Sequence, residues 1–193
     1  LRDAGLAHVP VISLSAQGFE QNPGFKIAPA IMHRAFMALV YGDLLMRVLY
    51  ATRPYEALPG SANALYEEWN AKLKKDLKSL SILKYHRNIA AIVKDFDKLL
   101  LLDIKKPKVG VVGEILVKFH PTANNDIVNV LEREGAEVVM PDLLDFFFYA
   151  AYTNDFKHRK LSASKKSARM GNLIIWALEL YRRKMKKALA ASQ

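Results

Sequence analysis

Polar side chains gather between residues 113 and 125, where the potential for side-chain chemistry is most concentrated. A short apolar segment, Lys108–Gly113, precedes this stretch, and residues with helical spacing follow it. In open parallel sheets, ligands bind beyond the carboxyl ends of the strands, where loop amides and helix N-termini point outward. The sequence therefore predicts a candidate ligand loop made of Gly113, Glu114, Lys118, His120, Asn124 and Asn125.

A purely structural interpretation of these residues stays open. Gly110 and Gly113 do not complete the G-x-G-x-x-G pattern of dinucleotide-binding loops, so Gly113 is equally compatible with a simple turn. Thr122 or Asn124 is equally typical of a helix N-cap. The pattern indicates a ligand loop or a capped turn, and it assigns no catalytic residue.

Several kinds of chemistry are excluded by composition and spacing. The chain has no cysteine, which rules out a disulfide, a thiolate nucleophile, a Cys-ligated zinc and a cysteine-bound iron–sulfur cluster within these residues. The five histidines show neither H-x-x-x-H nor H-E-x-x-H spacing, so we expect no metal site. The serine-hydrolase motif G-x-S-x-G and the Walker A phosphate loop are also missing. We expect no cofactor bound by this chain alone.

The net charge of +10 is concentrated at the C-terminal end. Residues 156–193 hold 11 of the 29 Lys and Arg residues but one of the 19 acids, Glu179. Such a segment attracts phosphates or an acidic partner, although a solvated helix face has the same composition. Nucleic acid is not favoured, because no aromatic side chain interrupts the basic run Arg182–Lys187.

The elements that would position these groups begin with a short strand and a long helical stretch. Val9–Ser15 is β-branched and bounded by turn formers, so it predicts a strand. Residues 27–103 predict successive helices, the first running from Ile27 to Ala51. Within it Asp43 and Arg47 are four residues apart, acid first, which predicts a helical ion pair.

A β-α-β unit is predicted next. Lys108–Gly113 and Ala136–Met140 have strand character, and Ile127, Val130 and Leu131 between them have helical spacing. Strand, helix and strand within about thirty residues predict parallel strands with a right-handed crossover. Two further helices are expected, over 143–152 and 164–190.

The predicted fold class is therefore α/β, with one or more parallel-sheet, Rossmann-like lobes and a long helical connector. Residues 1–26 would end a first α/β lobe, residues 27–103 would form the connector, and residues 104–193 would form a second α/β lobe with a basic C-terminal helix. No stretch free of charged residues is long enough to predict a membrane span.

Five stretches carry a resemblance to a known family. The most specific runs from Lys106 to Tyr149 and contains Val-Gly-Glu-Ile-Leu-Val-Lys-Phe-His-Pro-Thr-Ala-Asn-Asn-Asp; the supporting stretches are Val9–Ser15, Asn22–Phe25, Tyr41–Arg47 and Thr52–Glu56. Together they resemble the large activase-related proteins of the 2-hydroxyacyl-CoA dehydratase system, the group similar to activators of 2-hydroxyglutaryl-CoA dehydratase.

The resemblance implies an internal piece of a long cytoplasmic protein from an anaerobe. Members of this family carry actin-like ATPase modules and a region similar to the dehydratase subunits, whose α/β lobes hold a [4Fe-4S] cluster on cysteines and whose substrates are acyl-CoA thioesters. This sequence has neither the cysteines nor an ATPase motif. ATP and the cluster are thus implied for the parent protein, and no ligand residue can be carried over to this chain.

Two functional hypotheses follow. In the first, this chain is the cysteine-free middle of a dehydratase-like module, inactive alone, and supplies scaffold and part of a surface for acyl-CoA, for flanking domains, or for a dehydratase or electron-transfer partner. In the second, it is a non-catalytic binding module whose basic C-terminal helix docks on an acidic partner or nucleic acid.

Overall fold

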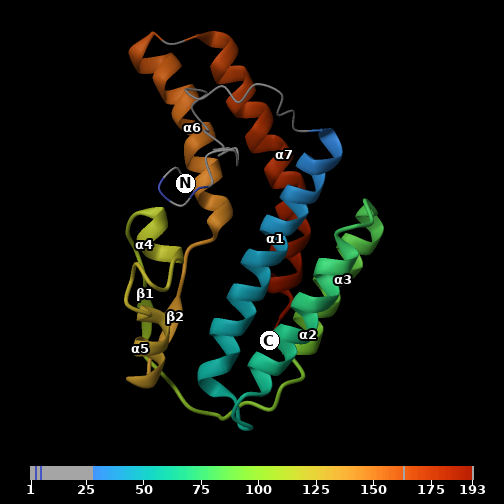
Figure 1. Ribbon diagram of the computed structural model, residues 1–193, viewed down its shortest axis with the longest axis vertical. Coiled ribbons are helices and arrows are strands. Elements are labelled where there is room, and N and C mark those ends of the chain that lie inside the picture. The colour runs from blue at the N-terminus through green and yellow to red at the C-terminus, as the bar shows by residue number, and fades with distance from the viewer. Residues whose placement is uncertain (1–2, 4, 6–27, 163, 193) are drawn as a thin grey trace.

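The computed structural model describes residues 3, 5, 28–162 and 164–192, and within them the chain is mostly helical (Figure 1). The elements in chain order are α1 (Pro29–Thr52), the short 3-10 helix η1 (Arg53–Tyr55), α2 (Ser61–Asp76), α3 (Ile82–Phe96), β1 (Lys108–Gly110), α4 (Ile115–Phe119), α5 (Ile127–Arg133), β2 (Glu137–Val139), α6 (Leu143–Leu161) and α7 (Lys165–Ala190).

The predicted α/β fold class is wrong for the described residues. Their one sheet has two strands, β1 and β2, of three residues each, which is far from a Rossmann-like lobe. The physical reason is that the long apolar helix faces bury one another, so no wide sheet is needed to cover them. The predicted strand at 9–15 lies outside the described residues.

The β-α-β unit is present in reduced form. β1 and β2 are parallel, with Lys108 opposite Glu137 and Gly110 opposite Val139, and α4 and α5 lie between them in the chain. Glu137 and Val138 are buried, whereas Val139 is exposed. The small sheet therefore packs on the helices through part of β2 and serves to anchor the segment that carries the predicted ligand loop.

Helix α1 is the central element. It contacts α2, α3, α6, α7 and β2, and most of its apolar residues from Met37 to Leu49 are buried. The stretch from Pro29 to Tyr55 is long and apolar enough to cross a membrane by length and composition, and 44% of its most apolar window is buried inside the protein. A central core helix satisfies the same criterion.

The core is shared by helices from both ends of the chain. Two features hold α3 in place: Ser81 accepts a hydrogen bond from the Lys84 amide at its N-terminus, and the Tyr85 hydroxyl donates to the Tyr181 carbonyl oxygen at 2.9 Å. The buried apolar cluster includes Met37, Val40, Leu44, Trp69, Leu73, Tyr85, Ile89, Ile92, Phe96, Leu144, Leu178 and Met185.

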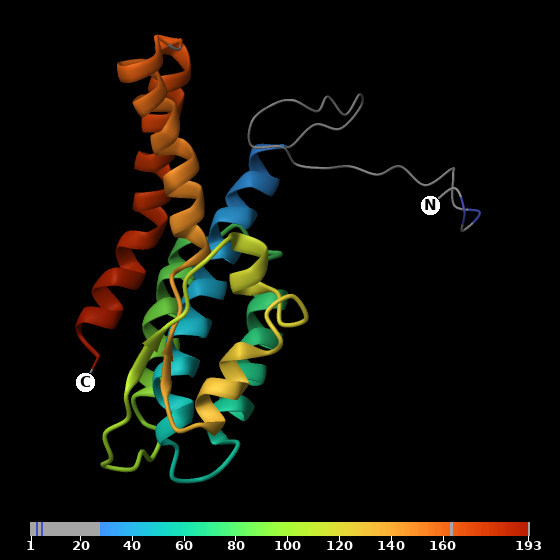
Figure 2. The same ribbon diagram turned by 90° about the vertical axis from the view of Figure 1, so that its left-hand side faces the viewer.

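Helices α6 and α7 form a long antiparallel hairpin. Their lower halves pack against the other helices, while their upper halves extend beyond α1 (Figures 1 and 2). Gly171 allows the two helices to approach closely, because a Cβ atom there would lie 2.5 Å from the Ala151 carbonyl oxygen. Helix α6 ends at Leu161, nine residues beyond the predicted end at residue 152.

Candidate functional site

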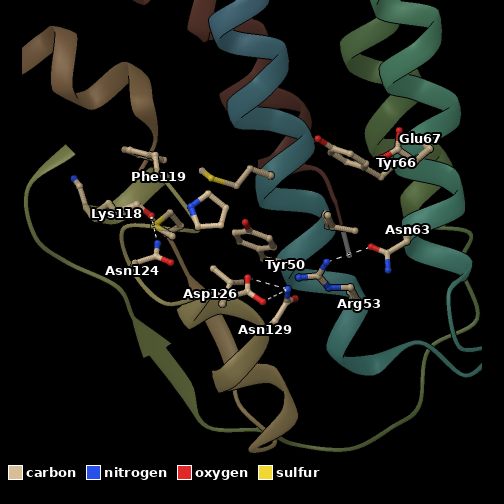
Figure 3. Close-up of a pocket in the computed structure, with 15 residues that line it drawn as sticks. Tyr50, Arg53, Asn63, Tyr66, Glu67, Lys118, Phe119, Asn124, Asp126 and Asn129 are labelled. Atoms are coloured by element: carbon tan, nitrogen blue, oxygen red, sulfur yellow. Dashed lines mark hydrogen bonds between the residues drawn. The ribbon is translucent and has the colours of Figure 1, made fainter. Parts of the chain in front are cut away.

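A pocket of about 450 Å³ lies between α1, α2 and the segment that joins α4 to α5 (Figure 3). Its walls combine aromatic rings, three asparagines and charged side chains of both signs. The lining residues are Met46, Leu49, Tyr50, Arg53, Asn63, Tyr66, Glu67, Lys118, Phe119, Pro121, Asn124, Asp126, Val128, Asn129 and Met140. The volume falls in the range typical of small-molecule sites.

The end of α1 places Arg53 at the pocket wall. Helix α1 ends at Thr52 and the chain continues as η1 from Arg53, whose backbone angles are still helical. The Arg53 guanidinium donates to both carboxylate oxygens of Glu132, at 2.7 and 2.9 Å, and to Asn63 Oδ1 at 3.2 Å. These contacts connect the end of α1 with α5 and α2. The donors of Arg53 are therefore used within the protein, where they stabilise the pocket wall.

Two residues of the predicted ligand loop reach this pocket. Asn124 donates to the Lys118 carbonyl oxygen at 3.1 Å and accepts from the Ile127 amide at the start of α5 at 3.3 Å, while the N-cap position of α5 is occupied by Asp126. The Lys118 ammonium lies 5.4 Å from the centre of the Phe119 ring and points outward at the rim (Figure 3). Lys118 is therefore a rim cation, and Asn124 shapes the wall.

The other predicted loop residues do not line the pocket. Glu114 caps the short helix α4 by accepting from the Leu116 amide at 2.8 Å. Gly113 has φ of +142°, so it occupies a turn conformation that side chains rarely adopt. His120 is exposed, and Asn125 has φ of 54° in a left-handed turn. These four residues shape the loop, and the structure does not bring them together as one site.

Several lining residues were missed from the sequence because they come from other parts of the chain. Tyr50 and Arg53 lie on one side of the end of α1, and Asn63, Tyr66 and Glu67 come from α2. The Arg53-Pro54 pair is a local signal for the end of a helix, and it gives no indication of what lies opposite. Burial raises the pKa of the Tyr50 hydroxyl, which keeps it a neutral hydrogen-bonding group in this wall.

Among the residues that the structure describes, no group of three or more His, Asp or Glu side chains is placed to hold a metal ion. The donor set also does not fit a [4Fe-4S] cluster, because the whole sequence lacks cysteine. The lining places amide, carboxylate and cationic groups beside aromatic and methionine side chains, and no nucleophile paired with a base is among its residues.

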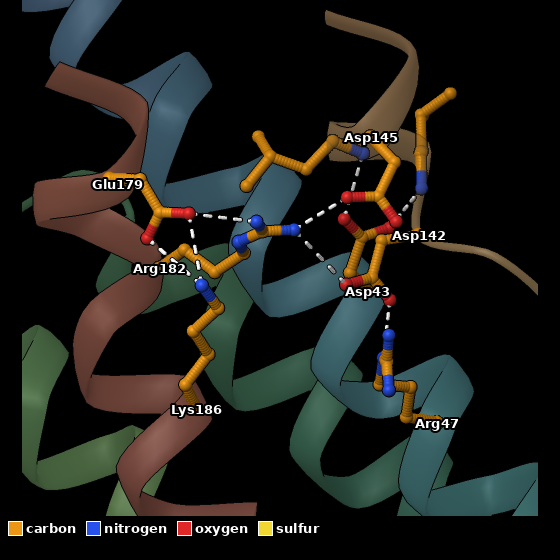
Figure 4. A network of polar contacts seen from close by, with 9 residues as sticks. Asp43, Arg47, Asp142, Asp145, Glu179, Arg182 and Lys186 are labelled. Carbon is orange, nitrogen blue, oxygen red and sulfur yellow. Dashed lines mark hydrogen bonds and ion pairs between the residues drawn. The ribbon is translucent and has the colours of Figure 1, made fainter. Parts of the chain in front are cut away.

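A second polar cluster, the ionic network, lies where α1, α6 and α7 meet (Figure 4). Asp43 accepts hydrogen bonds from the Leu143 and Leu144 amides at 2.8 and 2.9 Å, so a side chain of α1 caps the N-terminus of α6. Arg47 is ion-paired with the buried Asp142. The predicted Asp43–Arg47 pair is thus replaced by contacts with residues about a hundred positions away.

Helix α7 completes this ionic network. Arg182 donates to Asp145 at 2.5 Å and to Glu179 at 2.8 Å, and Lys186 lies 3.0 Å from Glu179. The guanidinium of Arg182 also stacks on the Phe148 ring, with 4.3 Å between its carbon and the ring centre. Part of the basic tail is therefore neutralised inside the protein.

The carboxylates outnumber the cations in the ionic network. Asp43, Asp142, Asp145 and Glu179 face Arg47, Arg182 and Lys186. The pKa of the Asp43 carboxyl is raised to about 6, mainly by burial and also by the nearby carboxylates of Asp142 and Asp145, against the lowering effect of its two amide donors. The network joins three helices, and Asp43 is the carboxyl in it whose pKa burial raises.

Comparison with known proteins found no matching family model, no matching curated protein and no matching solved structure.

Proposed function

We propose that this chain is the scaffold of a 2-hydroxyacyl-CoA dehydratase-like module and that the pocket at α1, α2 and residues 118–129 binds the pantetheine arm of an acyl-CoA. The observation that carries the proposal is that Lys118 and Asn124, which lie in the stretch that most resembles this family, share a pocket of about 450 Å³. The proposal rests on those residues and on the pocket, and not on a shared α/β fold.

The lining matches the chemistry of a pantetheine arm. Met46, Leu49 and Met140 give an apolar floor for a flexible chain, and the asparagines at the wall offer partners for its amide groups. The cation Lys118 stands at the rim, where the phosphates of the nucleotide part would lie outside the cavity. Arg53 is held by Glu132 and Asn63, which leaves Lys118 as the phosphate contact.

The reaction itself would depend on groups outside this chain. The [4Fe-4S] cluster and the ATPase of the resemblance need cysteines and a nucleotide module that these 193 residues do not supply. When bound to the parent protein, the cluster would supply electrons to the substrate. The residues of this chain would bind and orient the thioester, which is a positioning role.

Isothermal titration calorimetry with butyryl-CoA, CoA and free pantetheine tests the proposal. We expect the Lys118→Ala variant to bind butyryl-CoA about tenfold more weakly, as the loss of one charge-assisted contact predicts, and to bind pantetheine as tightly as the unmodified chain does. Lys94→Ala is the matched control, because Lys94 is an exposed lysine of α3 outside the pocket.

Equal affinities of the two lysine variants for butyryl-CoA would contradict the proposal, and so would the absence of binding by all three compounds. The family assignment has a separate test. The parent protein, purified without oxygen, should show iron–sulfur absorbance, and a parent that binds no cluster would rule out the dehydratase-like module even if the pocket binds CoA.

A further inference from the structure

A cluster of positive charge without ion pairs lies at the end of the α6–α7 hairpin. Residues 156–178 contain no Asp or Glu. Arg182 and Lys186 are neutralised by Glu179 and Asp145, and Arg159 by Asp155. Within the part of the chain that the structure describes, exposed cations with no ion pair surround the hairpin end, namely Lys157, Lys160, Lys165, Lys166 and Arg169.

Two exposed apolar stripes run along the hairpin beside these cations. On α6, Tyr149, Tyr152 and Phe156 are 70, 56 and 49% exposed, and their spacing of three and four residues puts them on one side of the helix. On α7, Leu173, Trp176 and Leu180 have the same spacing and are more than half exposed. Each stripe is about 10 Å long.

Exposed apolar surface of this extent, bordered by polar residues, marks an interaction site in a soluble domain. The stripes lie on helices that already pack tightly against each other through Ala151, Ala168 and Gly171, so these aromatic side chains are not needed to hold the hairpin together. We call the two stripes, together with the cations at the hairpin end, the hairpin surface.

We propose that the hairpin surface docks an acidic amphipathic helix of a partner protein. A helix with apolar residues at every third and fourth position matches the spacing of the stripes, and its acidic residues would meet the cations at the hairpin end. This inference is independent of the acyl-CoA pocket, which lies at the opposite end of α1 (Figures 1 and 3).

Other occupants fit the hairpin surface less well. A second copy of this chain would bring its own cations, which repel those of the first. Residues 6–27 contain one acid, Glu20, and one base, Lys26, so they offer no complementary charge. A nucleic acid strand would follow the cations at 157–169 and leave the aromatic rings of the stripes, which do not alternate with them, without bases to stack on.

An anionic membrane also fits less well. The end of the hairpin carries Lys165, Lys166 and serines together with the exposed Leu161 and Met170, whereas the two stripes lie further back along the helices. A hairpin that entered the membrane end-first would therefore bury its charges deepest, whereas interfacial helices bury an apolar face and keep the cations outside.

Trp176 provides the measurement. It is 64% exposed, and the only other tryptophan, Trp69, is 4% exposed, so docking on the stripes should shift the emission of Trp176 to shorter wavelength. The probe is an 18-residue helical peptide with leucines on one face and glutamates on the other. We expect saturable binding that weakens as salt rises from 0.05 to about 0.5 M.

Matched charge variants locate the site. We expect the triple variant Lys165→Gln, Lys166→Gln and Arg169→Gln to bind the peptide about tenfold more weakly, as the loss of three exposed ion pairs predicts. The control variant changes Lys74, Lys75 and Lys78 of the α2 end, which are equally exposed, to Gln and should bind as the unmodified chain does. A peptide with lysines in place of glutamates should not bind.

Three results would overturn the proposal. The first is equal binding of the acidic peptide by both triple variants. The second is no binding of that peptide by the unmodified chain. The third is binding of phosphatidylglycerol vesicles or of a 20-residue oligothymidylate that depends on the hairpin cations while the acidic peptide does not bind, which would assign the surface to a membrane or to nucleic acid.

Discussion

Replacement of Asp43 by Asn is expected to change how the stability of this protein depends on pH. The Asp43 side chain is 3% exposed and caps α6 from the neighbouring helix α1. Its folded-state pKa is raised to about 6 by burial, from an ordinary value of 3.8. Between about pH 4 and pH 6 the folded protein therefore holds a proton at Asp43 that the unfolded chain has already lost.

The size of the effect follows from that difference. A carboxyl whose pKa is raised on folding contributes stability that is complete below the unfolded value and is lost as pH rises through the folded value. A shift of about two units corresponds to about 3 kcal/mol in the free energy of unfolding. We therefore expect Asp43 to lower the free energy of unfolding by about 3 kcal/mol as pH rises from 4 to 7.

Urea unfolding at several pH values between 4 and 8 measures this effect. Other groups also titrate: the pKa of Asp76 is lowered mainly by its hydrogen bond with Lys84, so the stability from Asp76 is lost as pH falls. The informative quantity is the difference in unfolding free energy between the unmodified chain and Asp43→Asn, because contributions common to both cancel. The variant itself loses about 1–2 kcal/mol, since an amide cannot accept from both backbone donors of α6.

We expect that difference to shift by about 3 kcal/mol in favour of Asp43→Asn as pH rises from 4 to 7. Asp103→Asn serves as the control, because Asp103 is exposed, and its curve should run parallel to that of the unmodified chain. A difference for Asp43→Asn that stays constant over this pH range would refute the reasoning that burial and excess negative charge control this carboxyl.

Two further predictions concern packing and capping. Gly171→Ala should destabilise the protein by about 2 kcal/mol, because the new Cβ would meet the Ala151 carbonyl oxygen, whereas Gly42→Ala, in open space on α1, should stabilise it by about 0.5–1 kcal/mol. Thermal unfolding distinguishes the two, and a Gly171→Ala variant of unchanged melting temperature would disprove the tight helix contact. Glu56→Ala should lower the unfolding free energy by about 1–2 kcal/mol, because the Glu56 carboxylate accepts hydrogen bonds from two backbone amides, at 2.7 and 2.8 Å, at the start of α2. Urea unfolding measures this loss, and an unchanged midpoint would show that water replaces the cap.

Helices could be located from the sequence because helical periodicity is a local property. The spacing of apolar residues predicted a first helix over 27–51, and α1 runs from Pro29 to Thr52. The basic C-terminal helix was placed at 164–190 and is found at Lys165–Ala190. In each case the spacing of apolar side chains within one segment was sufficient.

The fold class could not be obtained in the same way. β1 and β2 were recognised as parallel strands, but the number of strands that join a sheet depends on segments far apart in the chain. Strand-like segments predicted a wide sheet, whereas the described residues hold two short strands against a helical core. Which faces cover one another is decided by packing, and packing is not visible in local periodicity.

The sequence by itself determined the chemistry available: no cysteine, a basic tail, and a polar loop that includes Lys118 and Asn124. Only the tertiary structure placed those two residues opposite Tyr50, and Asp43 against the start of α6. The physical reason is that residue types and local helix formation are set within a few positions of the chain. Contacts between residues separated by about seventy to a hundred positions form only when the apolar faces of the helices pack against one another.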